Sequence, residues 1–186
     1  MTFTPIRVAM LLGSARGSGW TRKLAQALGS VAPASLALHS VRIDDLPLYH
    51  EDLEAEPPPA WSRFRDAIRS ADALLFVSPE YNRSIPALLK NAIDIGSSPE
   101  DRSVWAKKPG GVVSFSPGSL GGFGANHHLR QCLVFLDVPV LQQPEMYLSR
   151  VDQLFDETGA LSEDGGHALL SAFMTAFADW ASRGLS

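Results

Sequence analysis

A glycine- and hydroxyl-rich stretch at residues 13–19, directly after the first apolar run, has the residue types of a phosphate-binding loop. Ser14, Ser18 and Thr21 supply hydroxyl groups, and the guanidinium of Arg16 can pair with a phosphate. A loop that leads from a strand into a helix points backbone N–H groups and the positive helix end at one spot. The stretch has neither the Gly-Lys-Ser/Thr of a Walker loop nor the G-x-G-x-x-G spacing. The residues alone therefore leave an ordinary glycine turn as the alternative.

A second polar stretch, at residues 80–84, follows the unbroken apolar run 73–77. Such a run is too short for a helix and predicts a parallel strand buried on both faces. Ser84 lies two residues before Pro86 and is expected to cap the next helix. The stretch therefore lies at the carboxyl end of a central strand, where open α/β sheets bind ligands. We interpret Glu80 as a solvated or loop-bracing carboxylate and not as a proton donor.

Three further groups of residues are interpreted as structural. The adjacent His127 and His128 point to different helix faces and have no ligand partner at metal-binding spacing, so we predict no metal site. The acidic pairs at 44–45 and 51–52 are assigned to a structural loop. Cys132, the only cysteine, is expected to pack on an apolar helix face, and a lone cysteine fits a reducing compartment.

Strands and helices are expected to alternate along the whole chain. Strands are predicted at 6–12, 36–43, 73–77, 110–115 and 138–141, each followed by apolar residues at helical spacing. Pro33 closes the first predicted helix, and the last is expected to start near residues 162–164 and to end by Gly184. A second glycine loop occupies 116–122. The alternation implies one α/β domain over residues 1–186, with a parallel sheet between two helical layers.

Composition narrows the range of partners and compartments. The 186-residue chain has a formal charge of −4, which disfavours nucleic acid and anionic membranes as partners. No apolar run approaches the roughly 20 residues that span a bilayer, and the run at 8–12 is too short for a signal peptide. We therefore expect a cytoplasmic protein. The last helix carries apolar residues on more than one stripe, which predicts a homo-oligomer, at least a dimer; these residues are Leu169, Leu170, Phe173, Met174, Phe177, Trp180 and Ala181.

The string PEYNRSIPALLKNAID at 79–94 resembles the signature of the NADPH-dependent FMN reductase family, which includes bacterial quinone, chromate and azo-dye reductases. GSARGSGWTRKLA at 13–25 resembles the phosphate loop of that family, SPGSLGG at 116–122 its third loop, and DLPLY at 45–49 a loop near the partner subunit. The chain departs from the family at four positions. Gly19 and Thr21 replace a serine and an asparagine, Arg83 an aromatic residue, and Ile95 a tryptophan.

The resemblance implies a flavodoxin-like three-layer sandwich with a five-stranded parallel sheet of order 2-1-3-4-5. It also implies that bound FMN carries the chemistry, without a catalytic side chain, and that NADPH or NADH supplies the hydride. Tyr81 offers an aromatic surface beside the flavin ring in this interpretation. The residues expected to bind FMN are Ser14, Arg16, Ser18, Gly19, Trp20, Thr21, Pro79, Glu80, Tyr81, Asn82, Ser116 and Gly118.

The predicted function is therefore an FMN-dependent oxidoreductase that uses NAD(P)H to reduce flavin, quinone or related small-molecule acceptors, chromate and azo compounds included. One alternative is a flavodoxin-type electron carrier that does not oxidise NAD(P)H itself. Flavodoxins are usually more acidic and have hydroxyl-rich phosphate loops, whereas this chain has Arg16 and a charge of −4. A second alternative is an FMN-binding regulatory protein.

Overall fold

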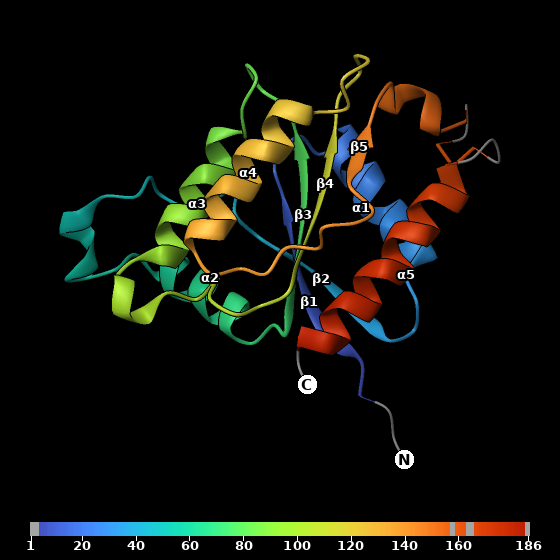
Figure 1. Cartoon of the computed structure of the whole chain (residues 1–186). Helices are drawn as coiled ribbons and strands as arrows, with labels where there is room; N and C mark the ends of the chain where they lie inside the picture. The colour runs from blue at the N-terminus through green and yellow to red at the C-terminus, as the bar shows by residue number, and fades with distance from the viewer. Residues whose placement is uncertain (1–3, 157–158, 163–165, 185–186) are drawn as a thin grey trace.

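A parallel five-stranded sheet of order β2-β1-β3-β4-β5 lies between two layers of helices in the computed structural model (Figure 1). The structure describes residues 4–156, 159–162 and 166–184. The strands are β1 (Ile6–Leu12), β2 (Leu36–Val41), β3 (Ala73–Pro79), β4 (Gly110–Phe115) and β5 (Met146–Leu148). The predicted flavodoxin-like fold and strand order are therefore confirmed. Strand β3 pairs with β1 on one side and with β4 on the other, so its carboxyl end is central.

Alternate residues of each central strand enter different cores, because side chains along a strand point to opposite faces. Leu75 and Val77 of β3 join the core under α1 (Trp20–Val31) and α5 (Gly166–Gly184). Leu74 and Phe76 join the core under α2 (Pro59–Arg69), α3 (Ala87–Ser97) and α4 (Phe123–Phe135). Every residue of β3 is buried, which explains why its sequence shows no polar alternation.

The helix after β3 begins differently from the prediction. Pro86 is the N-cap of α3, and no side chain caps that helix. The hydroxyl of Ser84 lies instead 2.7 Å from Nδ1 of His128 in α4. The prediction that Ser84 caps α3 is therefore wrong, because a partner on another helix takes its hydroxyl. Proline occupies the first position of α2, Pro59, where the missing N–H group costs the helix no hydrogen bond.

Three strand boundaries also differ, and the first is that of β3, which continues past the predicted 73–77 to Pro79. Strand β2 ends at Val41 and leaves Ile43 outside the sheet. The predicted strand at 138–141 makes only an isolated bridge between Val140 and Gly110, and the ladder with β4 is formed by β5. Pro139, which has no N–H group, interrupts the earlier segment, whereas residues 146–148 can pair along the end of β4.

Helix α5 covers its side of the sheet more completely than its sequence indicates. Among the seven apolar residues predicted to form several stripes, only Leu169 is exposed, at 44%. The side chain of Trp180 is partly buried and its Nε1 donates to the carbonyl of Pro139. The packing of α5 against both the sheet and α1 buries what looked like excess apolar surface, so this helix is not the exposed face that was predicted. The predicted acidic start at residues 163–164 lies outside the described residues, and α5 ends at Gly184 as predicted.

Three short 3-10 helices complete the chain: η1 (Glu51–Glu54), η2 (Glu100–Arg102) and η3 (Val151–Leu154). Among the described residues, no helix combines the length and the apolarity that crossing a bilayer requires.

Candidate FMN site

A cavity of about 430 Å³ lies at the carboxyl edge of the sheet, where the loops after β1, β3 and β4 meet. Its lining contains all the predicted FMN-binding residues except Asn82 and Gly118, which lie on the same loops outside it. The structure thus brings together residues up to about a hundred positions apart in the sequence. The lining residues are Ser14, Arg16, Ser18, Gly19, Trp20, Thr21, Lys23, Pro79, Glu80, Tyr81, Phe115, Ser116 and Pro117.

The phosphate loop, residues 13–19, reaches from β1 to α1 and is largely exposed. Gly19 is the N-cap of α1 and brings no side chain to the helix terminus, so the first-turn N–H groups are donors available to an anion. Inside the loop, the N–H of Arg16 donates to Oγ of Ser14 over 3.4 Å. A Cβ on Gly13 would lie 3.0 Å from Oγ of Ser78, so a side chain at this position would require Ser78 to move slightly.

The ring loop, residues 79–84, is a hairpin turn at the end of β3. Tyr81 and Ser84 exchange two backbone hydrogen bonds, each of 3.0 Å. Between them, Asn82 and Arg83 have φ of 51° and 65°, the left-handed pair that a two-residue type I′ turn requires. Asparagine suits that conformation, whereas arginine does so less well. The hydroxyl of Tyr81 donates to Oγ of Ser14 over 3.3 Å, which joins the ring loop to the phosphate loop.

Glu80 anchors the ring loop to α4. Its side chain is 10% exposed, its Oε2 accepts a bond of 3.1 Å from the N–H of Ala125, and its Oε1 lies 3.3 Å from Nη1 of Arg83. A carboxylate at the first turn of a helix also meets the positive end of the helix dipole. A Cβ on Gly124 would lie 2.8 Å from the carbonyl oxygen of Arg83, so the loop and the helix are in close contact. Of the two roles left open for Glu80, these contacts support bracing of the loop.

The third loop, residues 116–122, is held by its own backbone and by the segment after β5. The hydroxyl of Ser116 donates to the carbonyl of Gly118 over 3.2 Å, and the N–H of Arg150 donates to the same carbonyl over 3.0 Å. Gly121 has φ of 59°, and a Cβ there would lie 2.7 Å from the backbone of Tyr147. The third loop therefore depends on glycine to fit between β4 and β5.

One wall of the cavity is a stack of aromatic and cationic side chains that sequence reasoning found only in part. Trp20 stacks on Phe155 with 5.6 Å between ring centroids, and Nζ of Lys23 lies 4.6 Å from the centre of the Trp20 ring. Lys23 was not predicted, although its i+3 spacing from Trp20 places both on one helix face. Phe115 and Pro117, the other missed residues, flank the predicted Ser116. The cavity therefore has two basic side chains, Arg16 and Lys23, at its phosphate-loop end.

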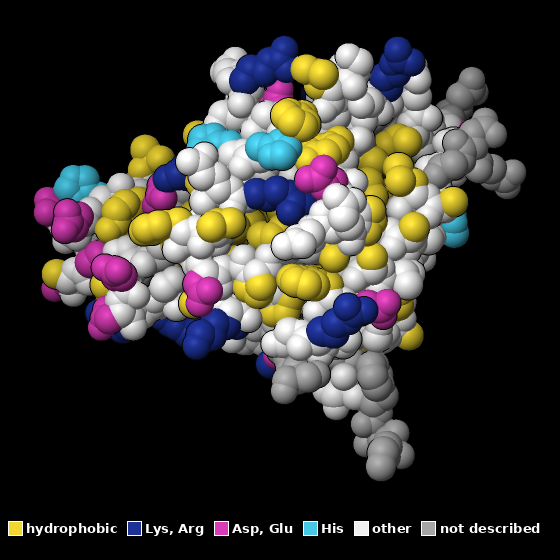
Figure 2. All heavy atoms as spheres, viewed as in Figure 1, with side chains coloured by type: hydrophobic (Ala, Val, Ile, Leu, Met, Phe, Trp, Pro, Cys, Tyr) yellow, Lys and Arg dark blue, Asp and Glu magenta, His cyan; other side chains and the backbone are white. Residues whose placement is uncertain are grey.

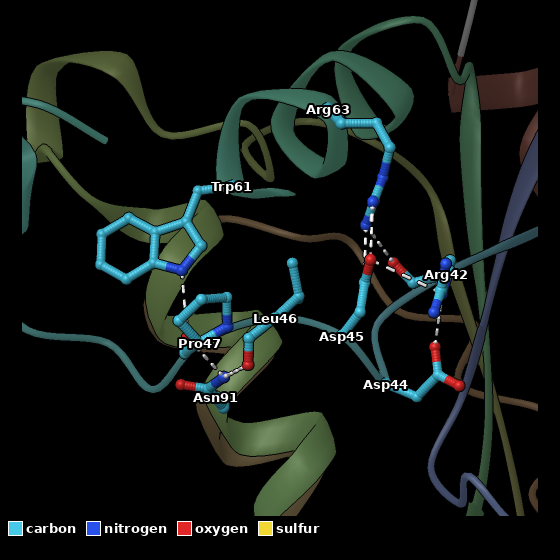
Figure 3. Close-up of polar contacts among 8 residues, drawn as sticks. All are labelled: Arg42, Asp44, Asp45, Leu46, Pro47, Trp61, Arg63 and Asn91. Atoms are coloured by element: carbon cyan, nitrogen blue, oxygen red, sulfur yellow. Dashed lines mark hydrogen bonds and ion pairs between the residues drawn. The ribbon is translucent and has the colours of Figure 1, made fainter. Parts of the chain in front are cut away.

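The residues assigned to structural roles lie outside this cavity. Nη1 and Nη2 of Arg63 bind both carboxylate oxygens of Asp45 at 2.8 and 2.7 Å, and Asp44 pairs with Arg42 at 3.0 Å (Figure 3). The hydrogen bond from Arg63 lowers the pKa of Asp45. Within the described residues, no group of three or more His, Cys, Asp or Glu is arranged to hold a metal ion. Cys132 is half-buried, and burial raises the pKa of its thiol, which keeps it protonated and unreactive.

Asn91 holds the DLPLY loop from below (Figure 3). Its amide nitrogen donates to the carbonyls of Leu46 and Pro47 over 3.3 and 3.2 Å, and its Oδ1 accepts from the N–H of Tyr49 over 2.8 Å. Nε1 of Trp61 donates to the carbonyl of Pro47 as well. Three buried or half-buried bonds to one amide fix the loop, which supports the structural role predicted for it.

The donor set of the cavity fits FMN. Arg16, Lys23, three hydroxyl groups and the uncapped N-terminus of α1 suit a phosphate, and Tyr81 and Trp20 suit an aromatic ring. A volume of about 430 Å³ lies in the usual range for small-molecule sites, about 300–1,000 Å³.

Comparisons with known proteins agree with this geometry. The family described as NADPH-dependent FMN reductase matches residues 6–153. A quinone reductase of Pseudomonas putida is 57% identical over 174 residues, which cover 93% of each chain. A 2-hydroxy-1,4-benzoquinone reductase of a Burkholderia species is 38% identical over 94% of this chain and 96% of its own.

A solved structure gives the same result. The flavoenzyme FerB of Paracoccus denitrificans, an NAD(P)H:(acceptor) oxidoreductase, superposes with a TM-score of 0.91 at 34% identity and covers 96% of this chain and 98% of its own. The resemblance inferred from the loop motifs is thereby confirmed on independent grounds. The chain belongs to the NADPH-dependent FMN reductase family, as an oxidoreductase that takes FMN as its cofactor and electrons from NAD(P)H.

Proposed function

We propose that this enzyme reduces quinones with electrons from NAD(P)H, as one FMN-binding domain over residues 1–186 with the cofactor in the cavity at the carboxyl edge of the sheet. The observation that carries the proposal is the combination of charge and aromatic surface in that cavity. Arg16 and Lys23 bring positive charge around the start of α1, and Trp20 and Tyr81 bring aromatic rings to the same lining. A flavin with a phosphate tail matches both features.

Each loop then has a separate task. Arg16, with the hydroxyls of Ser14, Ser18 and Thr21 and the backbone at Gly19, binds the phosphate. The main chain of residues 79–82 pairs with the polar edge of the ring. Ser116 and Gly118 close over the pyrimidine side, and Trp20 packs beside the cofactor. Bound FMN supplies hydride acceptance from NAD(P)H and electron transfer to the acceptor.

The preference for quinones rests on the acceptors named for two similar proteins, a quinone reductase and a 2-hydroxy-1,4-benzoquinone reductase. The mouth of the cavity is compatible with a flat aromatic acceptor, since Tyr81 is 50% exposed there and the phosphate loop has short side chains around Arg16. We also propose free flavin, chromate and azo compounds as electron acceptors of this enzyme.

An anaerobic titration tests the proposal. NADPH or NADH should bleach the flavin band near about 450 nm of the FMN-loaded protein, because the chromophore belongs to the cofactor, and a benzoquinone should restore it. A panel of quinone, flavin, azo and metal-oxyanion acceptors then ranks the substrates. Bleaching by dithionite but not by either nucleotide would identify an electron carrier instead.

We further propose a cytoplasmic homo-oligomer, a dimer or tetramer, with α4 at the interface. Val134 and Phe135 at the end of α4 are 74% and 87% exposed, and hydrophobic side chains run across the face that carries α4 and the segment between α4 and β5 (Figure 2). Exposed apolar patches of this kind usually mark an interface. Light scattering at micromolar protein should give at least a dimeric mass, and Phe135→Asp should reduce it; a monomeric mass would refute this proposal.

A further inference from the structure

A second hollow, of about 240 Å³, lies on the other side of the phosphate loop, toward the carboxyl end of β2. It shares Ser14 with the FMN cavity, so the two hollows are neighbours at the phosphate loop. Its walls are both apolar and polar. The lining residues are Leu12, Ser14, Ala15, Arg22, Ser40, Val41, Arg42, Ile43, Asp44 and Leu88.

The first turns of α1 divide their basic side chains between the two hollows. Lys23 lines the FMN cavity, where it lies over Trp20, whereas Arg22 lines the second hollow. Arg22 is exposed, and no carboxylate in the described part of the chain lies within 4.0 Å of its guanidinium. Arg22 therefore brings an uncompensated positive charge to a concave surface, which an anionic ligand can use.

The charges on the opposite wall nearly cancel. Asp45 is taken by Arg63, which binds both of its oxygens, and Asp44 pairs with Arg42 at 3.0 Å (Figure 3). Arg42 also makes a longer ion pair with Asp45, whose Oδ2 lies 3.6 Å from its Nε. With each carboxylate matched by one guanidinium, Arg22 leaves the hollow with a net positive charge.

We propose that this hollow is the subsite for the 2′-phosphate of NADPH, bound between Arg22 and Arg42. The inference rests on the NAD(P)H dependence of the proposed function, and it assigns the preference for NADPH over NADH. The two nucleotides differ only in that phosphate, so a subsite that recognises it must be separate from the flavin. The apolar residues Leu12, Ile43 and Leu88 give the attached nucleoside a non-polar surface.

Binding of nucleotide fragments tests the subsite without catalysis. Calorimetry on the FMN-loaded full chain should show 2′,5′-ADP binding at least about tenfold more tightly than 5′-AMP or inorganic phosphate, the effect of one added charge-assisted contact at a partly exposed site. Arg22→Ala should remove that difference, and Arg102→Ala, an exposed arginine in η2, should keep it. Equal affinity for 2′,5′-ADP and 5′-AMP overturns the proposal, and inorganic phosphate binding as tightly as 2′,5′-ADP overturns the nucleotide assignment.

Steady-state kinetics of two variants give a second test. One variant removes a positive charge from the hollow and the other removes a negative charge. Arg22→Ala should raise the KM for NADPH about tenfold and change the KM for NADH less than about twofold. Asp44→Asn removes the nearer of the two carboxylates beside Arg42 and should lower the KM for NADPH. An NADPH-to-NADH ratio that neither variant moves overturns the subsite while leaving the proposed function intact. Failure to oxidise either nucleotide in the unmutated enzyme would overturn the proposed function as well.

Discussion

The phosphate loop and the ring loop meet at one cavity but are held by different means. In residues 13–19 the two ends are tied down, since the N–H of Gly13 donates to the carbonyl of Val77 and the N–H of Gly19 to that of Arg16. Residues 15–18 between them are exposed. In residues 79–84 the turn is closed by paired backbone bonds, and Glu80 and Ser84 both reach α4. The ring loop is therefore fixed by the protein, while the phosphate loop presents donors that face water.

This difference suits the two parts of the cofactor. Free N–H groups lose little while they are hydrated and become strong donors when an anion arrives. A ring that must be oriented for hydride transfer needs a surface arranged in advance, because contacts set before binding cost no reorganisation. We therefore expect mutations in the phosphate loop to act on FMN affinity, and mutations around the ring loop to act on stability.

Replacing Arg16 should give the largest effect on binding. Arg16→Ala removes a charge-assisted contact of about 1.5–3 kcal/mol and should weaken FMN about 10- to 100-fold. The affinity for riboflavin, which lacks the phosphate, should fall by less than about threefold. Fluorescence titration of the apoprotein with both flavins measures this, and Arg102→Ala serves as the control. A loss of equal size for both flavins would show that Arg16 does not meet the phosphate.

Replacing Glu80 should have the largest effect on stability. Glu80→Ala leaves the buried N–H of Ala125 without its acceptor and Arg83 without its carboxylate. We expect the free energy of unfolding in urea to fall by about 2 kcal/mol. Glu80→Gln keeps an acceptor oxygen and should recover at least half of that loss. If glutamine and alanine destabilise equally, the bond to α4 is not what the carboxylate contributes.

The parts of the fold that could be predicted are those whose cause is local. Strands β3 and β4 are buried over their whole length and β1 over residues 8–11, and these buried stretches are mostly apolar because both of their faces are covered. The phosphate loop could also be recognised, because the glycines and hydroxyl groups that form it are close together in the sequence. The motifs around these strands also place most of the candidate site.

The parts that could not be predicted depend on partners far away in the sequence. Ser84 looked like a cap for the next helix, but His128 takes its hydroxyl. The segment at 138–141 has strand composition, yet β4 pairs mainly with residues 146–148. Lys23 was missed because its position depends on Trp20 and Phe155. Apart from the i+3 pair of Trp20 and Lys23, none of these contacts is encoded in the spacing of nearby residues.

Ser84 gives a smaller test of the fixed ring loop. Ser84→Ala should lower the free energy of unfolding by about 1 kcal/mol, the usual net value of one hydrogen bond. A double-mutant cycle with His128→Ala should return a coupling energy of similar size, because the two side chains lie 2.7 Å apart. Urea unfolding of the four proteins measures it. Additive losses from the two single mutations would mean that the pair does not hold the loop to α4.

The smallest effect is expected at Tyr147, where the third loop meets α4. Burial, with the hydrogen bond to the carboxylate of Glu145, raises the pKa of Tyr147 to about 12, against about 10 in an unfolded chain. Between pH 10 and 12 the folded protein therefore keeps a proton that the unfolded chain releases, and the free energy of unfolding falls as pH rises. The stability present below pH 10 is lost through that interval.

The Tyr147→Phe variant has no phenol group to titrate. It should therefore lack this pH-dependent part of the free energy of unfolding. Because Tyr147 is only partly buried, solvent screening should hold the difference to less than about 1 kcal/mol. Urea unfolding of both proteins at about pH 9.5 and about pH 11.5, each about half a unit below one of the two pKa values, measures how the difference changes with pH. Parallel losses in the two proteins would assign the alkaline destabilisation to other groups. A smaller loss in Tyr147→Phe would show that the surroundings of Tyr147 stay folded around it. Since its hydroxyl lies 3.1 Å from His127 of α4, the region fixed around the ring loop would then reach β5.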